Sequence, residues 1–184
     1  AGNETTRNAI SHGIQALHEH PEQKAIWAAD FDAVAPSAVE EIVRWATPVI
    51  HFRRTATRDT EIGGQAIREG DKVVLWYCSG NRDEAVWDDP FRFDVRRDPN
   101  PHVGFGGPGP HYCLGAHLAR REMTVMFREI FRRMPDFEVV GEADRLQSFF
   151  IHGLKHMTVR FTPGAIESGR QGAIGKNSGW PSTR

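Results

Sequence analysis

The stretch FGGPGPHYCLG, residues 105–115, places one cysteine, Cys113, in a segment with four glycines and two prolines. Glycine and proline interrupt helices and strands, so this segment is predicted to be a loop whose path is closely defined. A pattern typical of an amphipathic helix follows the loop and ends before Pro135. Its apolar positions are Ala119, Met123, Phe127, Ile130 and Met134. The cysteine therefore lies at the start of a helix, where backbone N–H groups and the helix dipole favour a thiolate.

A thiolate at the start of a helix can serve several kinds of site. A redox sensor or a nucleophile can use it, and a bound metal ion deprotonates a thiol outright. Zinc needs about four ligands; no second cysteine lies nearby, so His111 and Cys113 alone match a zinc site weakly. Haem iron needs a single protein ligand and fits the loop better. The other cysteine, Cys78, lies in the apolar run VVLWYC and is predicted to be a small buried side chain.

The composition is that of an ordinary globular protein, with 184 residues, 39% hydrophobic residues, 26% charged residues and a formal net charge of −1. A general nucleic-acid binder would carry a basic excess, so this class is excluded. No apolar run reaches the roughly 18 residues that span a bilayer, and no secretory signal is visible. The cysteines are therefore expected to be reduced and the protein cytoplasmic. Because helical periodicity has already begun at the first residues, we expect a fragment whose N-terminal part is missing.

The apolar pattern along the chain predicts a mainly α protein with small β elements, without the alternation that builds a parallel sheet. Ser37, after Pro36, is a good N-cap for the third helix, and VVLWYC at 73–78 is predicted to be a buried strand. The glycine pair at 63–64 predicts a turn. Helices are predicted over 4–19, 22–30, 37–46 and from Leu114, strands within 49–62, 66–78, 137–140 and 156–162, an irregular functional loop over 79–112, and a disordered tail over 163–184.

Two further motifs each have an ordinary interpretation when taken alone. Glu41 and Arg44 are three residues apart on the predicted third helix, which is the spacing of a surface ion pair. Arg92, in DPFRF, could join them after the chain has turned back. Glu4 and Thr5 form a polar helix face by pattern, but an acid beside a hydroxyl is also a possible proton-delivery unit.

Taken in order, these motifs resemble the cytochrome P-450 haem-thiolate monooxygenases. They are AGNETT at 1–6, the E-x-x-R of EEIVRW at 40–45, PFRF at 90–93 and the G-x-H-x-C-x-G loop ending at Gly115. Each motif is weak alone, but four in the same order are specific. The resemblance covers residues 1–162 and implies the C-terminal, haem-binding part of a P-450 domain, with 163–184 as a tail. VEEIVRWATP, PNPHVGFGG and IHGLKH look most like actinobacterial enzymes that hydroxylate sterols and methyl-branched lipids.

The resemblance implies that Cys113 is the axial thiolate ligand of haem b iron. Arg54 and His111 match positions that bind the haem propionates, and Gly109 and Gly115 let backbone N–H groups approach the sulfur. One departure concerns Phe105, which precedes the cysteine by eight residues where the usual family pattern has seven, a mark of the sterol and branched-lipid subgroup. The implied cofactor-binding set is Ala1, Gly2, Arg54, Phe105, Gly106, His111, Cys113, Leu114 and Gly115.

Further roles follow from the resemblance. Glu4 and Thr5 match an acid–alcohol pair that holds water and delivers protons during O₂ activation. Glu41, Arg44 and Arg92 match a buried structural triad that supports the cysteine loop. Apolar segments at 48–51 and 149–151 match substrate contacts, although ordinary core packing is an open alternative. The implied substrate contacts are Val49, Ile50, Phe149, Phe150 and Ile151, with Pro48 and His51 beside them.

The implied function is insertion of one oxygen atom of O₂ into a C–H bond of an apolar substrate, a sterol or a methyl-branched lipid, and the fragment alone is expected to be inactive. Electrons would come from a ferredoxin docked at Arg120 and Arg121, unless these cations are only a solvated helix face. A peroxide-driven hydroxylase of the same fold is disfavoured by Glu4 and Thr5. A haem-binding sensor or carrier would need the thiolate but not this pair.

Overall fold

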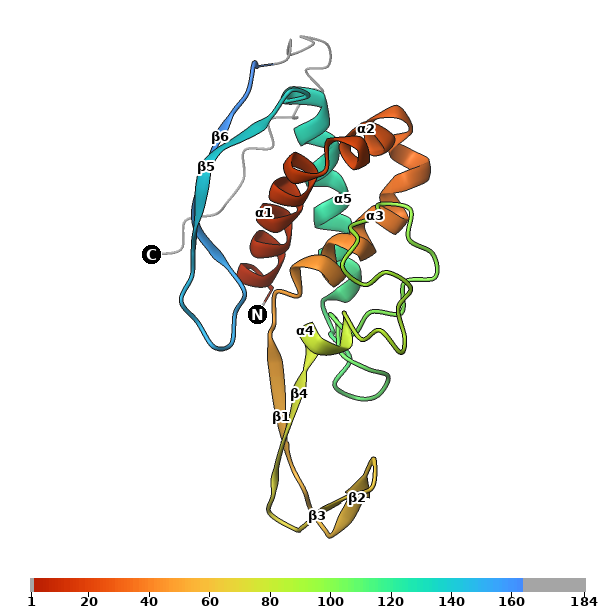
Figure 1. Cartoon of the computed structure of the whole chain (residues 1–184). Coiled ribbons are helices and arrows are strands. Elements are labelled where there is room, and N and C mark those ends of the chain that lie inside the picture. The colour runs from red at the N-terminus through yellow and green to blue at the C-terminus, as the bar shows by residue number, and fades with distance from the viewer. Residues whose placement is uncertain (1, 164–184) are drawn as a thin grey trace, which may run out of the picture.

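The computed structural model describes residues 2–163 of the chain. Ala1 and residues 164–184 lie outside the described part, and with them the interpretation of the tail. The first three helices are α1 (Glu4–Glu19), α2 (Pro21–Ala29) and α3 (Phe31–Ala46), followed much later by α5 (Ala116–Arg133). Figure 1 shows these helices packed as one bundle, with hairpins projecting from it. Among the described residues, no helix is both long and apolar enough to cross a membrane.

The core lies where α1, α3 and α5 cross. Gly13 marks the closest approach, because a Cβ at this position would lie 2.6 Å from Phe127 Cζ and 2.9 Å from Ile42 Cδ1. Both neighbours are themselves buried in the core. Trp27 of α2 stacks on this cluster, with its ring centroid 5.0 Å from that of Phe127. Only glycine lets α1 sit this close, so any side chain here would push the helices apart.

Helix α3 begins six residues earlier than the sequence pattern predicts, so the expectation that Ser37 is its N-cap is wrong. Asp30 caps the helix instead, with its carboxylate accepting from the Ala33 N–H at 3.2 Å. Pro36 lies inside the helix near its N-terminal end, where a missing N–H removes a single backbone bond. The Ser37 hydroxyl lies 3.1 Å from the Val34 carbonyl and 2.7 Å from that of Val95. It therefore ties α3 to the long loop.

Three small antiparallel hairpins complete the fold. The turn predicted at 63–64 is confirmed, since Gly63 and Gly64 both have positive φ between two short strands. The paired strands are β1 (His51–Thr55) with β4 (Lys72–Trp76), β2 (Thr60–Ile62) with β3 (Gln65–Ile67), and β5 (Glu138–Arg145) with β6 (Leu154–Arg160).

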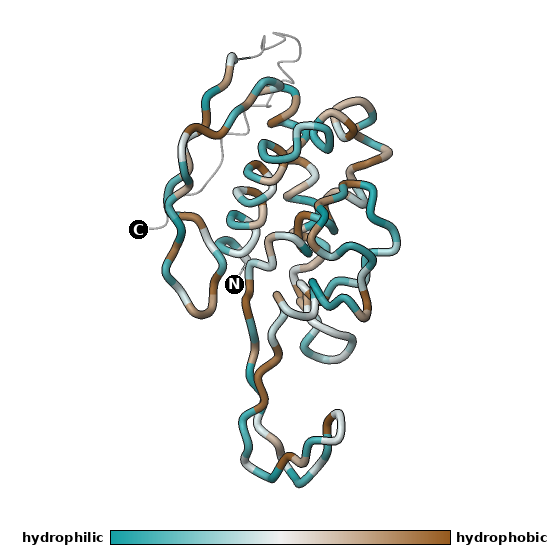
Figure 2. Tube along the Cα trace, viewed as in Figure 1, coloured by the Kyte–Doolittle hydropathy of each residue, from teal (hydrophilic) through white to brown (hydrophobic). Residues whose placement is uncertain are grey.

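The prediction of a buried strand over 73–78 is wrong in two respects. Strand β4 ends at Trp76, and Tyr77–Gly80 form a helical turn, α4, that carries Cys78. The strand is also not buried, since the Trp76 side chain is 54% exposed and Leu75 is exposed as well. Figure 2 shows brown, hydrophobic stretches along the projecting β1–β4 hairpin. An apolar run is typical of a strand covered on both faces, but within residues 2–163 no second layer covers this hairpin.

The irregular loop predicted over 79–112 is found over 81–115, since residues 79–80 belong to α4. It is held at its start by one buried side chain. Asn81 donates from Nδ2 to the Thr47 hydroxyl at 2.9 Å and accepts at Oδ1 from the Val103 N–H at 2.8 Å. Its backbone carbonyl accepts from Arg44 at 3.0 Å. A buried amide with all these partners fixes a loop as firmly as regular structure does.

Candidate functional site

Cys113 lies at the end of the glycine-rich loop, directly before α5, with its side chain exposed. Its N–H donates to the Phe105 carbonyl at 2.9 Å, which closes the loop on itself. Gly106 has a φ of +87° and donates to the Val103 carbonyl at 2.8 Å, so a residue with a Cβ would be strained there. Gly115 has an ordinary φ, and a Cβ on it would lie 4.0 Å from the Cys113 Sγ. Glycine at this position therefore keeps the approach to the sulfur clear.

A polar cluster beneath this loop fastens it to α3. The Glu40 carboxylate accepts from Arg120 Nε and Nη2 at 2.5 and 2.9 Å and lies 2.8 Å from His102 Nε2. Burial by itself would raise the pKa of Glu40, but the hydrogen bonds from His102 and Arg120 outweigh it and lower the pKa to about 2. The Phe105 ring lies against the same guanidinium, with its centroid 4.5 Å from Arg120 Cζ. Sequence reasoning missed Glu40, although it is the first acid of EEIVRW.

Arg120, which the sequence pairs with Arg121 as a possible docking cation, is bonded within the chain, with its side chain 30% exposed. Its guanidinium also donates to the Tyr112 hydroxyl at 3.3 Å. Arg121 is exposed and lines a groove of about 400 Å³ between α3 and α5. Both predicted docking cations line this groove, and the Arg120 guanidinium is paired there with Glu40.

The structure brings Glu41 and Arg44 together as a fully buried ion pair. Two parallel bonds of 2.7 Å join the Arg44 Nε and Nη2 to the two Glu41 oxygens. The remaining donors of Arg44 bind backbone carbonyls at 2.8–3.1 Å. These carbonyls belong to Asn81, Pro90 and Arg92. The pair thus holds the long loop against α3 with its charges and donors satisfied.

The expectation that the side chain of Arg92 completes this pair is wrong. That side chain is 60% exposed and lies 3.6 Å from Asp94, and only the Arg92 backbone carbonyl reaches Arg44. Arg97 takes the expected place, since its side chain is 12% exposed and its Nε lies 3.3 Å from Glu41. The chain bends so that the Arg92 carbonyl points at Arg44, and the same bend leaves the Arg92 side chain in solvent. The sequence signal for Arg97 was the Arg-Arg pair in DVRRDPN.

Glu4 and Thr5 occupy the first turn of α1. The Glu4 carboxylate is exposed and accepts from Arg7 Nη2 at 2.6 Å. This hydrogen bond and the charge of Arg7 hold the pKa of Glu4 below its usual value. Thr5 is half-buried, and Gly2 before it is exposed with a φ of +96°. The Glu4 carboxylate is thus turned along the helix toward Arg7, and Thr5 is the next residue on the same turn.

The two predicted substrate-contact segments lie side by side. Val49 and Ile151 form an isolated antiparallel bridge, and the Ile50 N–H donates to the Phe150 carbonyl at 2.9 Å. Phe149 is 83% exposed, so ordinary core packing does not explain it within this chain. Rings from both segments meet, since the centroids of His51 and Phe150 are 6.0 Å apart.

The other predicted haem contacts are at the surface. Arg54 on β1 is exposed and bonds only locally, to the Arg53 carbonyl at 3.1 Å. His111 is exposed in the glycine-rich loop, and Leu114 beside the cysteine is 100% exposed. One exposed thiol, an apolar side chain and exposed basic side chains fit an iron porphyrin, which takes one axial ligand and carries two carboxylates. Among residues 2–163, no cluster of three or more His, Cys, Asp or Glu side chains is placed to hold a metal ion.

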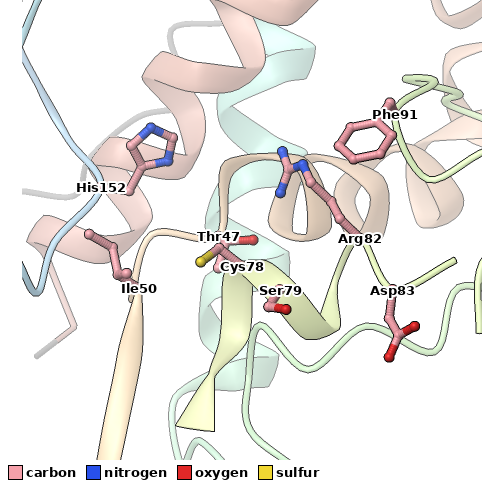
Figure 3. A pocket seen from close by; sticks show the side chains of 8 residues that line it. All are labelled: Thr47, Ile50, Cys78, Ser79, Arg82, Asp83, Phe91 and His152. Atoms are coloured by element: carbon pink, nitrogen blue, oxygen red, sulfur yellow. The ribbon is translucent and has the colours of Figure 1, made fainter. Parts of the chain in front are cut away.

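A pocket of about 750 Å³ lies beside the predicted substrate-contact segments, since Ile50 is one of its lining residues (Figure 3). It is bounded by the end of α3, the start of β1, α4 and the following loop. Its lining residues are Thr47, Ile50, Cys78, Ser79, Arg82, Asp83, Phe91 and His152. Cys78 is thus partly exposed on a pocket wall and not a core residue, which corrects the prediction for this cysteine.

Known proteins of similar sequence are hydroxylases and monooxygenases by name. The chain is 59% identical over 162 residues to a methyl-branched lipid omega-hydroxylase of Mycobacterium tuberculosis and 49% identical over 163 residues to a steroid C26-monooxygenase of the same species. These matches cover 88% of this chain in both cases, and 38% and 37% of the relatives. The chain therefore spans well under half the length of the curated relatives it matches.

Solved structures show the same fold. A Mycobacterium marinum cytochrome P450 in complex with pseudoionone superposes with a TM-score of 0.84 at 52% identity, over 86% of this chain and 38% of that one. A Bacillus megaterium cytochrome P450 in complex with testosterone gives 0.83 at 36% identity, over 88% and 45%. The family model described as Cytochrome P450 matches residues 33–149. The resemblance and the fold class predicted from sequence are confirmed: this chain belongs to the cytochrome P450 family.

Proposed function

We propose that the protein carrying this chain is a haem-thiolate monooxygenase that inserts one oxygen atom of O₂ into a C–H bond of an apolar lipid. The observation that carries the proposal is the exposed thiol of Cys113, held by a glycine-rich loop at the start of α5. Backbone N–H groups at a helix start favour the thiolate form, which is the form that binds iron. Haem b, when bound, supplies the iron that activates O₂ with electrons from a redox partner.

In this proposal the other exposed groups of the site complete the cofactor cradle. Arg54 would pair with a haem propionate, since a carboxylate taken out of water needs a paired charge, and His111 would hydrogen-bond a propionate. Leu114 packs on the porphyrin, and Gly106 gives the loop its turn. Ala1 and Gly2 leave room for O₂ beside Thr5, although Ala1 lies outside the described residues.

We further propose a sterol or a methyl-branched lipid as substrate. The candidate contacts are apolar, and they come from two segments that hydrogen bonds hold together, 49–50 and 149–151. The names of the relatives, a methyl-branched lipid hydroxylase and a steroid monooxygenase, support the same chemical class. The test is to incubate the haem-loaded protein with a methyl-branched fatty acid, a reducing system and isotopically labelled O₂. One labelled oxygen atom in the product supports the proposal, and label from water alone contradicts it.

Thr5→Ala is expected to leave haem binding intact and to lower the product formed per electron pair by about tenfold or more, with hydrogen peroxide formed instead. The reason is that the hydroxyl at the start of α1 orders the water that delivers protons. Electron consumption, peroxide and product are measured together. Ser11→Ala is the matched control, because this hydroxyl bonds the helix's own Arg7 carbonyl at 3.0 Å. Unchanged coupling in Thr5→Ala would show that Glu4 and Thr5 are only a polar helix face.

We propose a cytoplasmic location and a ferredoxin-type electron donor that docks at Arg121. Arg121→Glu is expected to slow reduction by ferredoxin about tenfold at low salt, because a cation beside the groove between α3 and α5 steers an acidic partner. Arg120 is kept, since its loss would break the bond to Glu40. Stopped-flow reduction is measured, with Arg133→Glu at the far end of α5 as control. Equal ferredoxin rates in Arg121→Glu and wild type would rule out this docking face.

A further inference from the structure

One histidine fastens the turn that carries the exposed phenylalanines. His152 Nδ1 lies 2.7 Å from the Ala46 carbonyl at the end of α3, so this nitrogen carries the proton and donates. Its Nε2 lies 3.4 Å from Arg145 Nη1 and therefore accepts, because a guanidinium can only donate. Its backbone N–H donates to the Pro48 carbonyl at 3.0 Å. The contact with Arg145 requires a neutral ring, because a protonated Nε2 would point a second N–H at the guanidinium.

A second histidine, from α1, completes the contact. His12 Nε2 lies 3.3 Å from the His152 carbonyl and donates to it. The two rings are 4.2 Å apart at their centroids with an angle of 32° between their planes. His12 is buried, and His152 is half-buried at the wall of the pocket in Figure 3. The turn at 148–151 is thereby joined both to α1 and to the end of α3.

The charges around His152 disfavour a second proton on its ring. Burial lowers the pKa of His152 from its ordinary 6.5, the Ala46 carbonyl opposes this, and the cations Arg145 of β5 and Arg82 of the loop lower it further. Burial, followed by the nearby His152 charge, lowers the pKa of His12 to about 4. Cys78 and Asp83 share the pocket wall with His152, and Asp83 is the acid among the lining residues.

The sign of the pH effect follows from these directions. A histidine whose pKa is lowered by folding is held neutral above about pH 6.5, and the contacts are then complete. As the pH falls below this value, His152 binds a proton when the turn is detached but not when the turn is packed against α1 and α3. The contact therefore weakens toward acid. A neighbouring hydrogen bond also joins this hairpin to α1, from the Leu154 N–H to Asn8 Oδ1 at 3.2 Å. It does not change with pH, because neither group titrates.

We propose that His152 is a positioning residue: in its neutral form it fixes the turn at 148–151 against α1 and α3, and its protonation releases that turn while the β5–β6 hairpin stays in place. The proposal rests on the proposed function only for its consequence, which is that lipid affinity falls at acid pH. The release itself is a property of the chain and needs no turnover to be seen.

The experiment measures amide hydrogen exchange of residues 146–153 in the haem-loaded protein, from about pH 7.5 down to about pH 5. His156→Gln is the matched control, because this exposed histidine on the same hairpin pairs with Asp144 and should not matter. In wild type and in the control, the exchange rate of residues 146–153 is divided by that of the exposed loop at 57–59. This ratio should rise about tenfold between about pH 7.5 and about pH 5. In His152→Gln, whose amide can still donate to the Ala46 carbonyl, this extra rise should vanish.

Arg145→Gln tests the same idea without removing the histidine. Loss of this cation should move the midpoint of the release to higher pH, since Arg145 opposes protonation of His152. An unchanged or lower midpoint would overturn the proposal, and so would the wild-type acid rise in His152→Gln. The dissociation constant of a methyl-branched fatty acid is measured in parallel. A pH-dependent turn in a protein that fails to bind lipid would refute the proposed substrate class and leave the positioning role intact.

Discussion

Cys113→Ser is expected to abolish the red-shifted Soret band of the reduced, carbon-monoxide-treated protein. That band reports a thiolate opposite carbon monoxide on haem iron, and a serine hydroxyl is a far weaker donor than a thiolate at neutral pH. The effect should be complete, because Cys113 is the only cysteine in the glycine-rich loop. The measurement is a carbon monoxide difference spectrum of the intact protein expressed with haem, together with its haem content.

Cys78→Ser is the matched control for this experiment. Cys78 lies on α4 at the wall of the pocket, whereas Cys113 lies in the glycine-rich loop before α5. Its replacement should leave the red-shifted band at full intensity. A band that survives in Cys113→Ser and is lost in Cys78→Ser would reverse the ligand assignment.

Glu41→Gln is expected to lower the free energy of unfolding by about 3–5 kcal/mol, because it leaves the Arg44 charge uncompensated at a fully buried site. Gln has nearly the same shape, so the loss reports charge and not packing. Urea unfolding followed by fluorescence and by haem release measures the change. A loss below about 1 kcal/mol would show that the pair is dispensable.

The two candidate third members of this network can be compared directly. Arg97→Ala is expected to cost about 2 kcal/mol, since it removes a partner of the buried Glu41 and bonds to the Asp88 and Arg92 carbonyls at 2.8 Å. Arg92→Ala should stay within about 0.5 kcal/mol, since this side chain is exposed. The reverse order of the two losses would restore Arg92 to the triad.

Sequence reasoning found the elements whose cause is local. The bounds of α1 follow from apolar periodicity and from Pro21, and the end of α5 from Pro135. The start of α3 was missed because a proline was taken as a boundary, whereas the Asp30 cap makes the preceding residues helical as well. Local rules of this kind predict helix type more reliably than helix starts.

The site residues that sequence reasoning missed depend on how the loop folds back. Arg92 and Arg97 lie in the same short stretch, and which of them faces Glu41 is decided by the bend between them. Glu40 gained its role only when Arg120, eighty residues later, met it. The exposure of β4 could not be predicted either. An apolar pattern is typical of a buried strand, but it does not tell which other element covers the strand.

The close approach at Gly13 limits how this scaffold can diversify. The backbone of α1 is already as near to Phe127 and Ile42 as atoms permit, so the helix cannot shift inward to accept a different ligand. The turn at 149–151 is less confined within this chain, because the Phe149 side chain is 83% exposed while the backbone of the turn is held by hydrogen bonds. Directed evolution for new specificities should therefore randomise these turn positions and leave the helix crossing unaltered.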